Sequence, residues 1–465
     1  MAAADGGGED YISELPDALL SVILSLLGTA EAARTAVLST RFRGVWAATP
    51  LRLDDLDLPA LGALGLGGGT RTTASSSPIA PWTARADAVT RVLASHPGPV
   101  ALFRLSRTSF RGRVDAAEAW FRELAAKRAR KVALLCAPEW CHLALADPLL
   151  GCATLESLAL GECRVSDRGA SAAASAARLT ELTLSSTHLS EAALQSVLSG
   201  CPALRSVMLK HVEGPRSVRV RSCRSLVLLR VWQYKNLEEL TVENAPCLER
   251  LLGDMRLTAA INVSGAPKLT AFGYVVISSS NFLLFDEVIE KDVCNGLRAP
   301  LLSVKILAIS VKFSSKNDMD KLMNLLNFFP FVETLHVQAS DTRYDLTQDS
   351  TDTVGSSYHE KLDLIGCVMN HLNSVRLESK VHNIYMLEFA CFLLARAQVL
   401  QLMTIQSKVF SIPQCVAGQQ ALLNQSHVAS TEAEIVFEDM ESHDLEHLSL
   451  ELANTLPDPF DTYHR

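Results

Sequence analysis

The strongest catalytic pattern in the sequence lies near its carboxy terminus. His443, Glu446 and His447 have the spacing H-x-x-E-H, in which two histidines one helical turn apart can bind zinc while the glutamate activates a water molecule. The motif lies in an acidic tail, no later histidine or glutamate offers an obvious third ligand, and a five-residue pattern arises readily by chance. We therefore expect no zinc site there, and a metallohydrolase is the weakest of the functions considered.

The cysteines are also poorly placed for metal binding. The chain has 11 cysteines and no C-x-x-C pair. Cys136 and Cys141 with His142 are the closest group, but no second pair follows at zinc spacing. We predict reduced thiols and no structural metal, since a chain without a secretory signal meets a reducing environment.

The segment 62–81, GALGLGGGTRTTASSSPIAP, could be taken for a phosphate-binding loop. Such a loop needs Lys and then Ser or Thr after its last glycine, whereas Gly69 is followed by Thr70 and Arg71. We interpret residues 60–82 as a flexible Gly/Ser-rich linker. No nucleophile elbow, dinucleotide fingerprint or kinase motif set occurs, so we predict a non-catalytic chain with no cofactor.

Composition narrows the class of partner. The chain has 465 residues, 48% hydrophobic and 20% charged, with a formal charge of -8, which argues against nucleic acid because phosphate binding needs clustered Lys and Arg. The acidic first ten residues are no secretory signal, and no later stretch is apolar enough to span a bilayer. We expect a cytoplasmic or nuclear protein. One basic cluster allows either a nuclear signal or, as we favour, the cationic end of a helix containing Trp120 and Phe121: Lys127, Arg128, Arg130 and Lys131.

The elements that organise the chain begin at its amino end. Leu15 as cap and Pro16 in the first turn predict the start of a helix, whose apolar residues recur at helical spacing: Leu19, Leu20, Ile23, Leu24 and Leu27. Gly28 ends this helix, and Thr29 is the expected cap of a second. A third short turn should hold Phe42 and Trp46. Three helices this small make no adequate core alone, so we expect the module to complete its core on another protein.

These residues carry a resemblance. Residues 12–46 are similar to an F-box in its plant form, with I-S-x-L-P-D-x-L-L, then T-x-E-A-x-R-T-x-V-L-S-x-R and a closing Trp. Phe42 and Val45 depart from the usual Trp and Leu but stay apolar. The alternative is an ordinary amphipathic hairpin packed into its own domain. The resemblance implies docking on a Skp-family adaptor, and through it on a cullin, by Leu15, Pro16, Leu19, Leu20, Ile23, Leu24, Leu27, Val37, Leu38 and Trp46.

From residue 100 onward a triplet of apolar residues recurs as L-x-x-L-x-L. Its middle residues between Phe103 and Val207 lie 24 to 29 positions apart, the period of leucine-rich repeats, in which each repeat gives one strand and a return segment. Other triplets include 237/240/242 and 332/335/337. Cys163 takes the turn position of such a repeat, and Ser190 should cap a return helix. Between Ser217 and Tyr274 the triplets crowd together, so we predict extended return segments there.

The carboxy-terminal part predicts one βαβ unit: a strand in 371–379, a helix in 384–396 and a strand from Val399. This unit and residues 433–439 resemble the FBD region of plant F-box proteins. We therefore expect an α/β fold: a three-helix F-box (10–50), the linker, a curved leucine-rich-repeat solenoid (83–340), an exposed polar loop (341–361), an FBD region (362–440) and an acidic tail (441–465). We further expect residues 1–60 to be separable from the repeats, because few contacts should join the two folds.

The family resemblance implies the substrate-recognition subunit of an SCF-type ubiquitin ligase, with repeats that bind an unknown target protein. The alternative is a leucine-rich-repeat scaffold that binds the adaptor without delivering a substrate. The sequence does not identify the target, because repeat faces of one family bind unrelated ligands.

Overall fold

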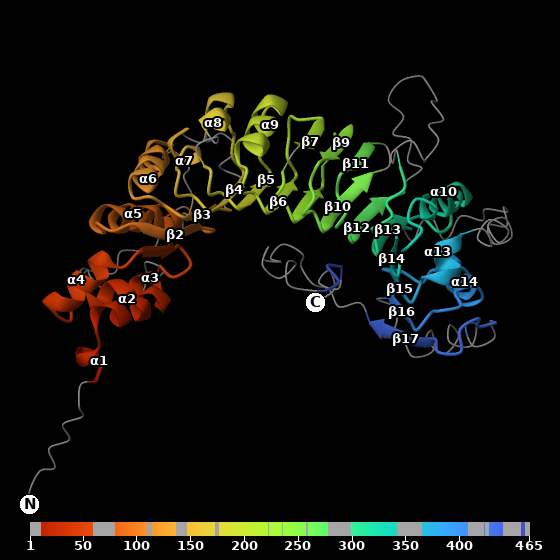
Figure 1. Cartoon of the computed structure of the whole chain (residues 1–465). Coiled ribbons are helices and arrows are strands. Elements are labelled where there is room, and N and C mark those ends of the chain that lie inside the picture. The colour runs from red at the N-terminus through yellow and green to blue at the C-terminus, as the bar shows by residue number, and fades with distance from the viewer. Residues whose placement is uncertain are drawn as a thin grey trace, which may run out of the picture. The chain divides into compact units, whose positions relative to one another are not determined.

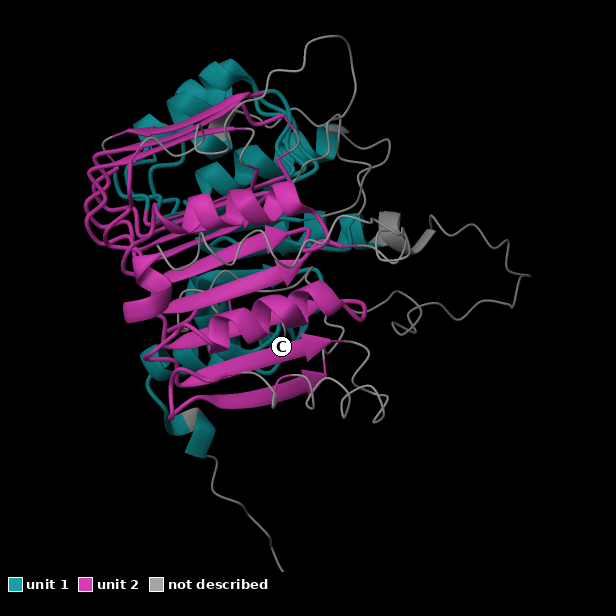
Figure 2. Ribbon diagram, turned by 90° about the vertical axis from the view of Figure 1, so that its right-hand side faces the viewer, with its two compact units in different colours: residues 1–204, 211–214 teal, residues 205–210, 215–465 magenta. Residues whose placement is uncertain are grey.

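The protein forms two compact units in a computed structural model (Figure 2). Unit 1 comprises residues 1–204 and 211–214, and unit 2 comprises residues 205–210 and 215–465. The structure describes residues 11–58, 80–108, 114–135, 147–172, 176–221, 223–234, 236–256, 259–277, 299–341, 365–407, 423, 427–439 and 457–460.

Unit 1 opens with a helical module, which we define as residues 11–48. Its helices are α1 (Tyr11–Glu14), α2 (Asp17–Leu26), α3 (Thr29–Thr35) and α4 (Thr40–Ala48). Pro16, at a φ of -60°, precedes the first residue of α2, so the predicted cap at Leu15 lies one residue too early. Ser39 caps α4, since its hydroxyl oxygen accepts from the Phe42 N–H at 3.1 Å.

A parallel sheet follows in unit 1. Its strands pair in chain order and are β1 (Leu51–Asp54), β2 (Val100–Leu105), β3 (Lys131–Leu134), β4 (Ser157–Gly161) and β5 (Glu181–Ser185). The helices after β1 lie along one side of these strands (Figure 1): α5 (Ala80–Ser95), α6 (Val114–Ala126), α7 (Asp147–Leu150), α8 (Asp167–Ala172) and α9 (Glu191–Gly200). This strand and helix alternation confirms the predicted repeats.

The residues predicted to face the interior do so. The triplet side chains on β2, β3, β4 and β5 are buried, as is Cys163 at its turn position. Ser190 caps α9 by accepting from the Ala193 N–H at 3.0 Å. The prediction that the basic cluster forms the last turn of the helix with Trp120 and Phe121 is wrong, because α6 ends at Ala126. The Lys127 amine instead donates to the carbonyls of Leu93 and His96 at the end of α5. This cation therefore stabilises the neighbouring helix.

Unit 2 contains a longer parallel sheet. Its strands, in spatial order, are β6 (Ser206–Lys210), β8 (Leu228–Trp232), β10 (Arg250–Arg256), β12 (Ala271–Val276), β13 (Ile306–Val311), β14 (Thr334–Ala339), β15 (Ser374–Ser379), β16 (Leu402–Ser407) and β17 (Glu434–Asp439). The intervening strands form a second parallel sheet: β7 (Ser217–Arg221), β9 (Glu239–Glu243) and β11 (Ala260–Ser264). The extended return segments predicted for this region are thus confirmed.

One predicted triplet belongs to the second sheet. The 237/240/242 triplet falls on β9, whereas Leu226, Leu229 and Val231 occupy the matching interior positions beside β8 in the long sheet. Both sets are apolar because they face each other across the same interior. A repeat whose two sides are strands therefore shows two triplets, and spacing alone does not distinguish them.

The predicted βαβ unit is confirmed as β15, α14 (Ile384–Leu394) and β16, with β15 and β16 parallel. β14 pairs directly with β15, so the FBD-like part continues the sheet of the repeats. Two further helices, α10 (Lys316–Leu326) and α13 (Gly366–Asn370), precede β14 and β15. Of the predicted polar loop, only Asp341 lies within the described residues.

Buried carboxylates fix the loops at the strand ends. Asp55, which follows β1, is fully buried and accepts from the Ser106 N–H (2.9 Å) and hydroxyl (3.2 Å). It also accepts from the Arg107 N–H (2.7 Å) and the Thr108 hydroxyl (2.8 Å). These donors all lie in the loop after β2, so a single carboxylate ties two neighbouring repeats together.

Asp341 does the same in unit 2. Its carboxylate accepts from the N–H groups of Phe313 (2.9 Å) and Ser314 (3.1 Å) and from the Ser314 hydroxyl (2.6 Å). It also accepts from the Asn383 amide at 2.9 Å. Asn383 in turn caps α14, so this carboxylate links the loop after β13 to the start of the helix that follows β15.

Replacing Asp55 should destabilise unit 1. Asp55→Ala leaves buried donors without acceptors, so we expect the free energy of unfolding to fall by about 3 kcal/mol. Glu118→Ala, on the exposed side of α6, is the matched control and should change it by less than about 0.5 kcal/mol. Urea unfolding followed by tryptophan fluorescence measures both, and equal losses would contradict the assignment.

Candidate functional site

The helical module has a small core of its own. Leu20 and Leu24 of α2 and Val45 of α4 are buried in it, with Leu15, Leu27, Phe42 and Trp46 packed around them. An ion pair at 2.8 Å between Arg41 and Asp17 fixes the start of α2 to α4. Because these contacts use only one side of α2, they leave its other side free to meet a partner.

That other side of α2 is also apolar. Leu19, Val22, Ile23 and Leu26 follow the spacing i, i+3, i+4, i+7, so they form one stripe along the helix. They are 50%, 56%, 43% and 81% exposed. Such a stripe is a candidate surface for protein binding, because isolated exposed leucines are common but an ordered apolar row is not.

Further exposed apolar residues flank α2 in the sequence. Val37 and Leu38, in the turn before α4, are 82% and 71% exposed, and Tyr11 and Ile12 of α1 are exposed as well. We call the following residues the outer apolar set: Ile12, Leu19, Val22, Ile23, Leu26, Val37 and Leu38. The three most exposed members of the set lie within one stretch of 13 consecutive residues: Leu26, Val37 and Leu38.

The structure divides the residues that the sequence predicted for adaptor binding. Five of them are exposed: Pro16, Leu19, Ile23, Val37 and Leu38. Leu20 and Leu24 lie in the module core, and Leu15, Leu27 and Trp46 are partly buried against it. Sequence reasoning missed Val22 and Leu26, although their helical spacing from Leu19 was a signal that could have found them.

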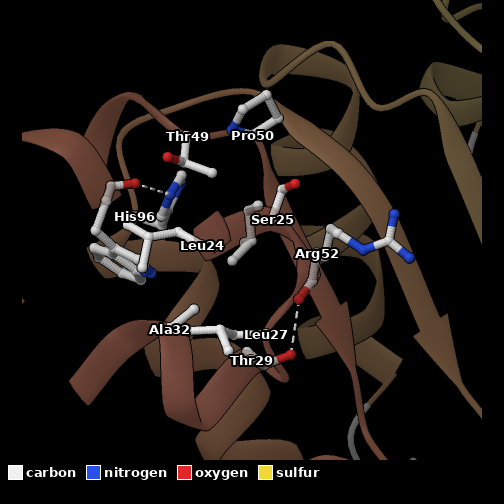
Figure 3. A pocket seen from close by; sticks show the side chains of 11 residues that line it. Leu24, Ser25, Leu27, Thr29, Ala32, Thr49, Pro50, Arg52 and His96 are labelled. Atoms are coloured by element: carbon white, nitrogen blue, oxygen red, sulfur yellow. Dashed lines mark hydrogen bonds between the residues drawn. The ribbon is translucent and has the colours of Figure 1, made fainter. Parts of the chain in front are cut away.

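The module is joined to the sheet at the start of α3. The predicted capping role of Thr29 is wrong: α3 begins at Thr29, and Gly28 occupies the cap position. The Thr29 hydroxyl instead donates to the Arg52 carbonyl at 2.7 Å (Figure 3) and accepts from the Asp54 N–H at 3.2 Å. Both partners belong to β1, so the hydroxyl serves the sheet rather than the helix.

His96 makes the second link. It is 1% exposed, and its Nε2 lies 3.1 Å from the Trp46 carbonyl oxygen (Figure 3). Its Nδ1 accepts from the Gly98 N–H at 3.2 Å, and its ring meets the Trp46 ring edge to face at 4.5 Å. Nδ1 accepts, so the imidazole is neutral. Burial lowers the pKa of His96 below its usual 6.5, against the opposing effect of the Trp46 carbonyl.

The space between these links is not a ligand site. The pocket in Figure 3 lies between Leu24, Ala32, Pro50 and His96 and has room for about one water molecule. Its walls come from the module and from β1, which pairs with β2 at Leu53 and Phe103. These contacts contradict the expectation that few residues join the first 60 residues to the repeats, because their removal would take away the first strand of the sheet and Asp55.

The described residues contain neither a cluster of metal ligands nor a membrane-spanning helix. Across the described residues, no group of three or more His, Cys, Asp or Glu side chains could hold a metal ion. The tail motif at His443–His447 and the group at Cys136–His142 lie outside the described residues. In the same part of the chain, no helix combines the length and apolarity needed to cross a membrane.

The chain is similar to proteins described as F-box and leucine-rich-repeat proteins. A family model described as "FBD-associated F-box protein At5g56370, LRR repeats" matches residues 117–337. The chain is similar to F-box/FBD/LRR-repeat protein At1g13570 of Arabidopsis thaliana, 24% identical over 87% of this chain and 92% of that protein. It is also 24% identical to F-box/FBD/LRR-repeat protein At4g00160 of Arabidopsis thaliana over 79% of both.

Shorter matches are closer. Over 42 residues, 9% of this chain and 10% of the other, the identity to putative F-box/FBD/LRR-repeat protein At2g05300 of Arabidopsis thaliana is 60%.

Acid should weaken the junction at His96. A folded pKa below that of the unfolded chain, about 6.5, means that the stabilisation is full above pH 6.5 and is lost as pH falls through the folded pKa. We expect the free energy of unfolding of unit 1 to drop between pH 7 and pH 5. His96→Gln, which keeps a donor but does not titrate, should flatten part of this drop, whereas exposed His188→Gln should not. Identical pH profiles for all three proteins would contradict this account of His96.

Proposed function

Because the chain is a relative of the plant F-box/FBD/LRR-repeat proteins, we propose that it is the substrate-recognition subunit of an SCF-type ubiquitin ligase. The helical module binds a Skp-family adaptor, which links it to a cullin. The repeats and the FBD-like strands bind a target protein. In this arrangement the chain contributes binding and orientation but no acid, base or nucleophile.

The observation that supports adaptor binding is the second apolar side of α2. Leu19, Val22, Ile23 and Leu26 lie outside the core formed by Leu20, Leu24 and Val45. Burying such side chains on a partner is worth roughly 1.5–3 kcal/mol each. An amphipathic helix usually has a single apolar side. Because α2 has two, one side can pack into its own fold while the other binds a partner.

Proximity then accounts for the catalytic effect. A target held on the same assembly as a ubiquitin-charged conjugating enzyme meets it at a raised effective concentration. The junction at Thr29 and His96 serves this role, because it fixes the docking module against the sheet of unit 1. A loosely tethered module would give a weaker effect.

Charge substitution on the outer side of α2 tests the docking. Leu26→Asp should weaken adaptor binding by about 2 kcal/mol or more, roughly 30-fold in Kd, because the side chain is a buried anchor only in the complex. Its effect on unfolding should be small, since Leu26 is exposed in the free protein. Calorimetric titration with purified adaptor and a urea melt give the two quantities.

Two matched variants complete the test. Leu20→Asp, in the core, should lose both stability and binding, and Leu302→Asp, exposed in unit 2, should lose neither. Wild-type affinity in a folded Leu26→Asp protein would refute this interface. Adaptor binding without ubiquitin conjugates on co-purified proteins, with the proteasome blocked, would favour a scaffold over a receptor.

A further inference from the structure

Part of the long sheet of unit 2, from β8 to β13, carries an apolar patch on the side that its triplets do not use. Neighbouring side chains along a strand point to opposite sides, and the triplets take the interior side. On the other side lie five buried residues of the strands from β8 to β13: Leu228, Leu252, Ala271, Tyr274 and Ala308. An apolar sheet surface of this kind needs a cover.

The cover is a short segment from the end of the chain, residues 457–460. Phe460 is fully buried against this patch. Its ring lies 5.3 Å from the Tyr274 ring, edge to face, and 5.4 Å from the His336 ring. The segment lies on the opposite side of the sheet from α10 and α14 (Figure 1). The patch is therefore shaped to receive an aromatic ring.

The same segment carries a charge to matching groups. The Asp458 carboxylate accepts from His336 Nε2 at 2.8 Å and from the Phe460 N–H at 2.9 Å. Burial raises the pKa of Asp458, but the His336 hydrogen bond and charge outweigh this, and Arg376 adds to them, so the pKa lies below its usual value. Arg250 also interacts with this charge. Three basic side chains from β10, β14 and β15 thus favour an acidic occupant.

Residues 457–460 form no strand, and the side chains of Asp458 and Phe460 both contact the sheet. Asp458 and Phe460 supply the polar and the apolar contact, and the Phe460 N–H to Asp458 bond shapes the turn between them. A segment attached through side-chain contacts of this kind can be exchanged for another that makes the same contacts. Its attachment to the chain raises its effective concentration, so a competing segment needs a higher intrinsic affinity or a higher concentration.

We propose that this face, defined by Leu228, Leu252, Tyr274, Ala308 and His336, is a binding site for a protein segment with an aspartate two residues before a phenylalanine. Asp458 and Phe460 are its resident occupant. The target role of such a segment rests on the proposed function, whereas its binding does not. A target with this Asp-x-Phe pattern displaces the tail and covers the same patch.

The test uses the full chain and a labelled peptide of residues 456–462, LPDPFDT. Asp458→Ala with Phe460→Ala in the chain should empty the site, so the peptide should bind this variant saturably. The unmodified chain should bind the peptide at least about tenfold more weakly than the double variant does, because its own tail competes for the site. Peptides with Ala in place of the aspartate or the phenylalanine should bind the double variant at least tenfold more weakly.

Further variants decide what each result means. Adding His336→Gln to the double variant should weaken peptide binding, whereas adding Leu302→Asp, at an exposed residue outside the patch, should not. A double variant that melts like the unmodified chain but binds no peptide would overturn the proposal, as would equal binding by both chains. If the double variant fails to fold, the single variant Asp458→Asn, which keeps the Phe460 ring, replaces it. This variant should bind the peptide more tightly than the unmodified chain does, and a folded Asp458→Asn protein that binds no better would also overturn the proposal. Adaptor affinity measured on the same samples separates failure of this site from failure of the docking module.

Discussion

Helix α2 is apolar on two sides, and a helix of that kind is fully covered only when both sides are packed. One side is packed by Val45, Phe42 and Trp46, and the other, from Leu19 to Leu26, faces solvent. The module therefore has a core of its own yet is incomplete as a hydrophobic unit. Its small size requires this, because four short helices cannot enclose every side chain of so apolar a helix.

The rest of unit 1 fixes the orientation of the helical module. Thr29 and His96 attach the module to β1 and to the end of α5, and Asp55 attaches β1 to the loop after β2. Each link joins a polar group to a backbone group in a buried place, where loss of the partner is costly. The module is thus joined to the start of the repeat stack at two points, so its orientation is fixed relative to the sheet of unit 1.

Much of this could be predicted from periodicity. The strand triplets, the Ser190 cap and the βαβ unit at β15–β16 follow from local spacing, which reports burial directly. Contacts between distant segments could not be predicted in this way. Thr29 is a good cap by type but bonds to β1, and Phe460 lies in a segment that reads as an acidic tail. Glu162 and Ser186, with φ of 52° and 47° directly after β4 and β5, give no sign of left-handed backbone in their residue types.

In the proposed complex, the outer side of α2 and the turn after α3 bind an adaptor, while the sheets do not. Amide hydrogen exchange of the purified protein, alone and with a saturating Skp-family adaptor, tests it most directly. The account predicts slower exchange in residues 17–38 on binding and little change in the strands of either unit. Protection confined to the strands, or none in residues 17–38 at saturation, would contradict it.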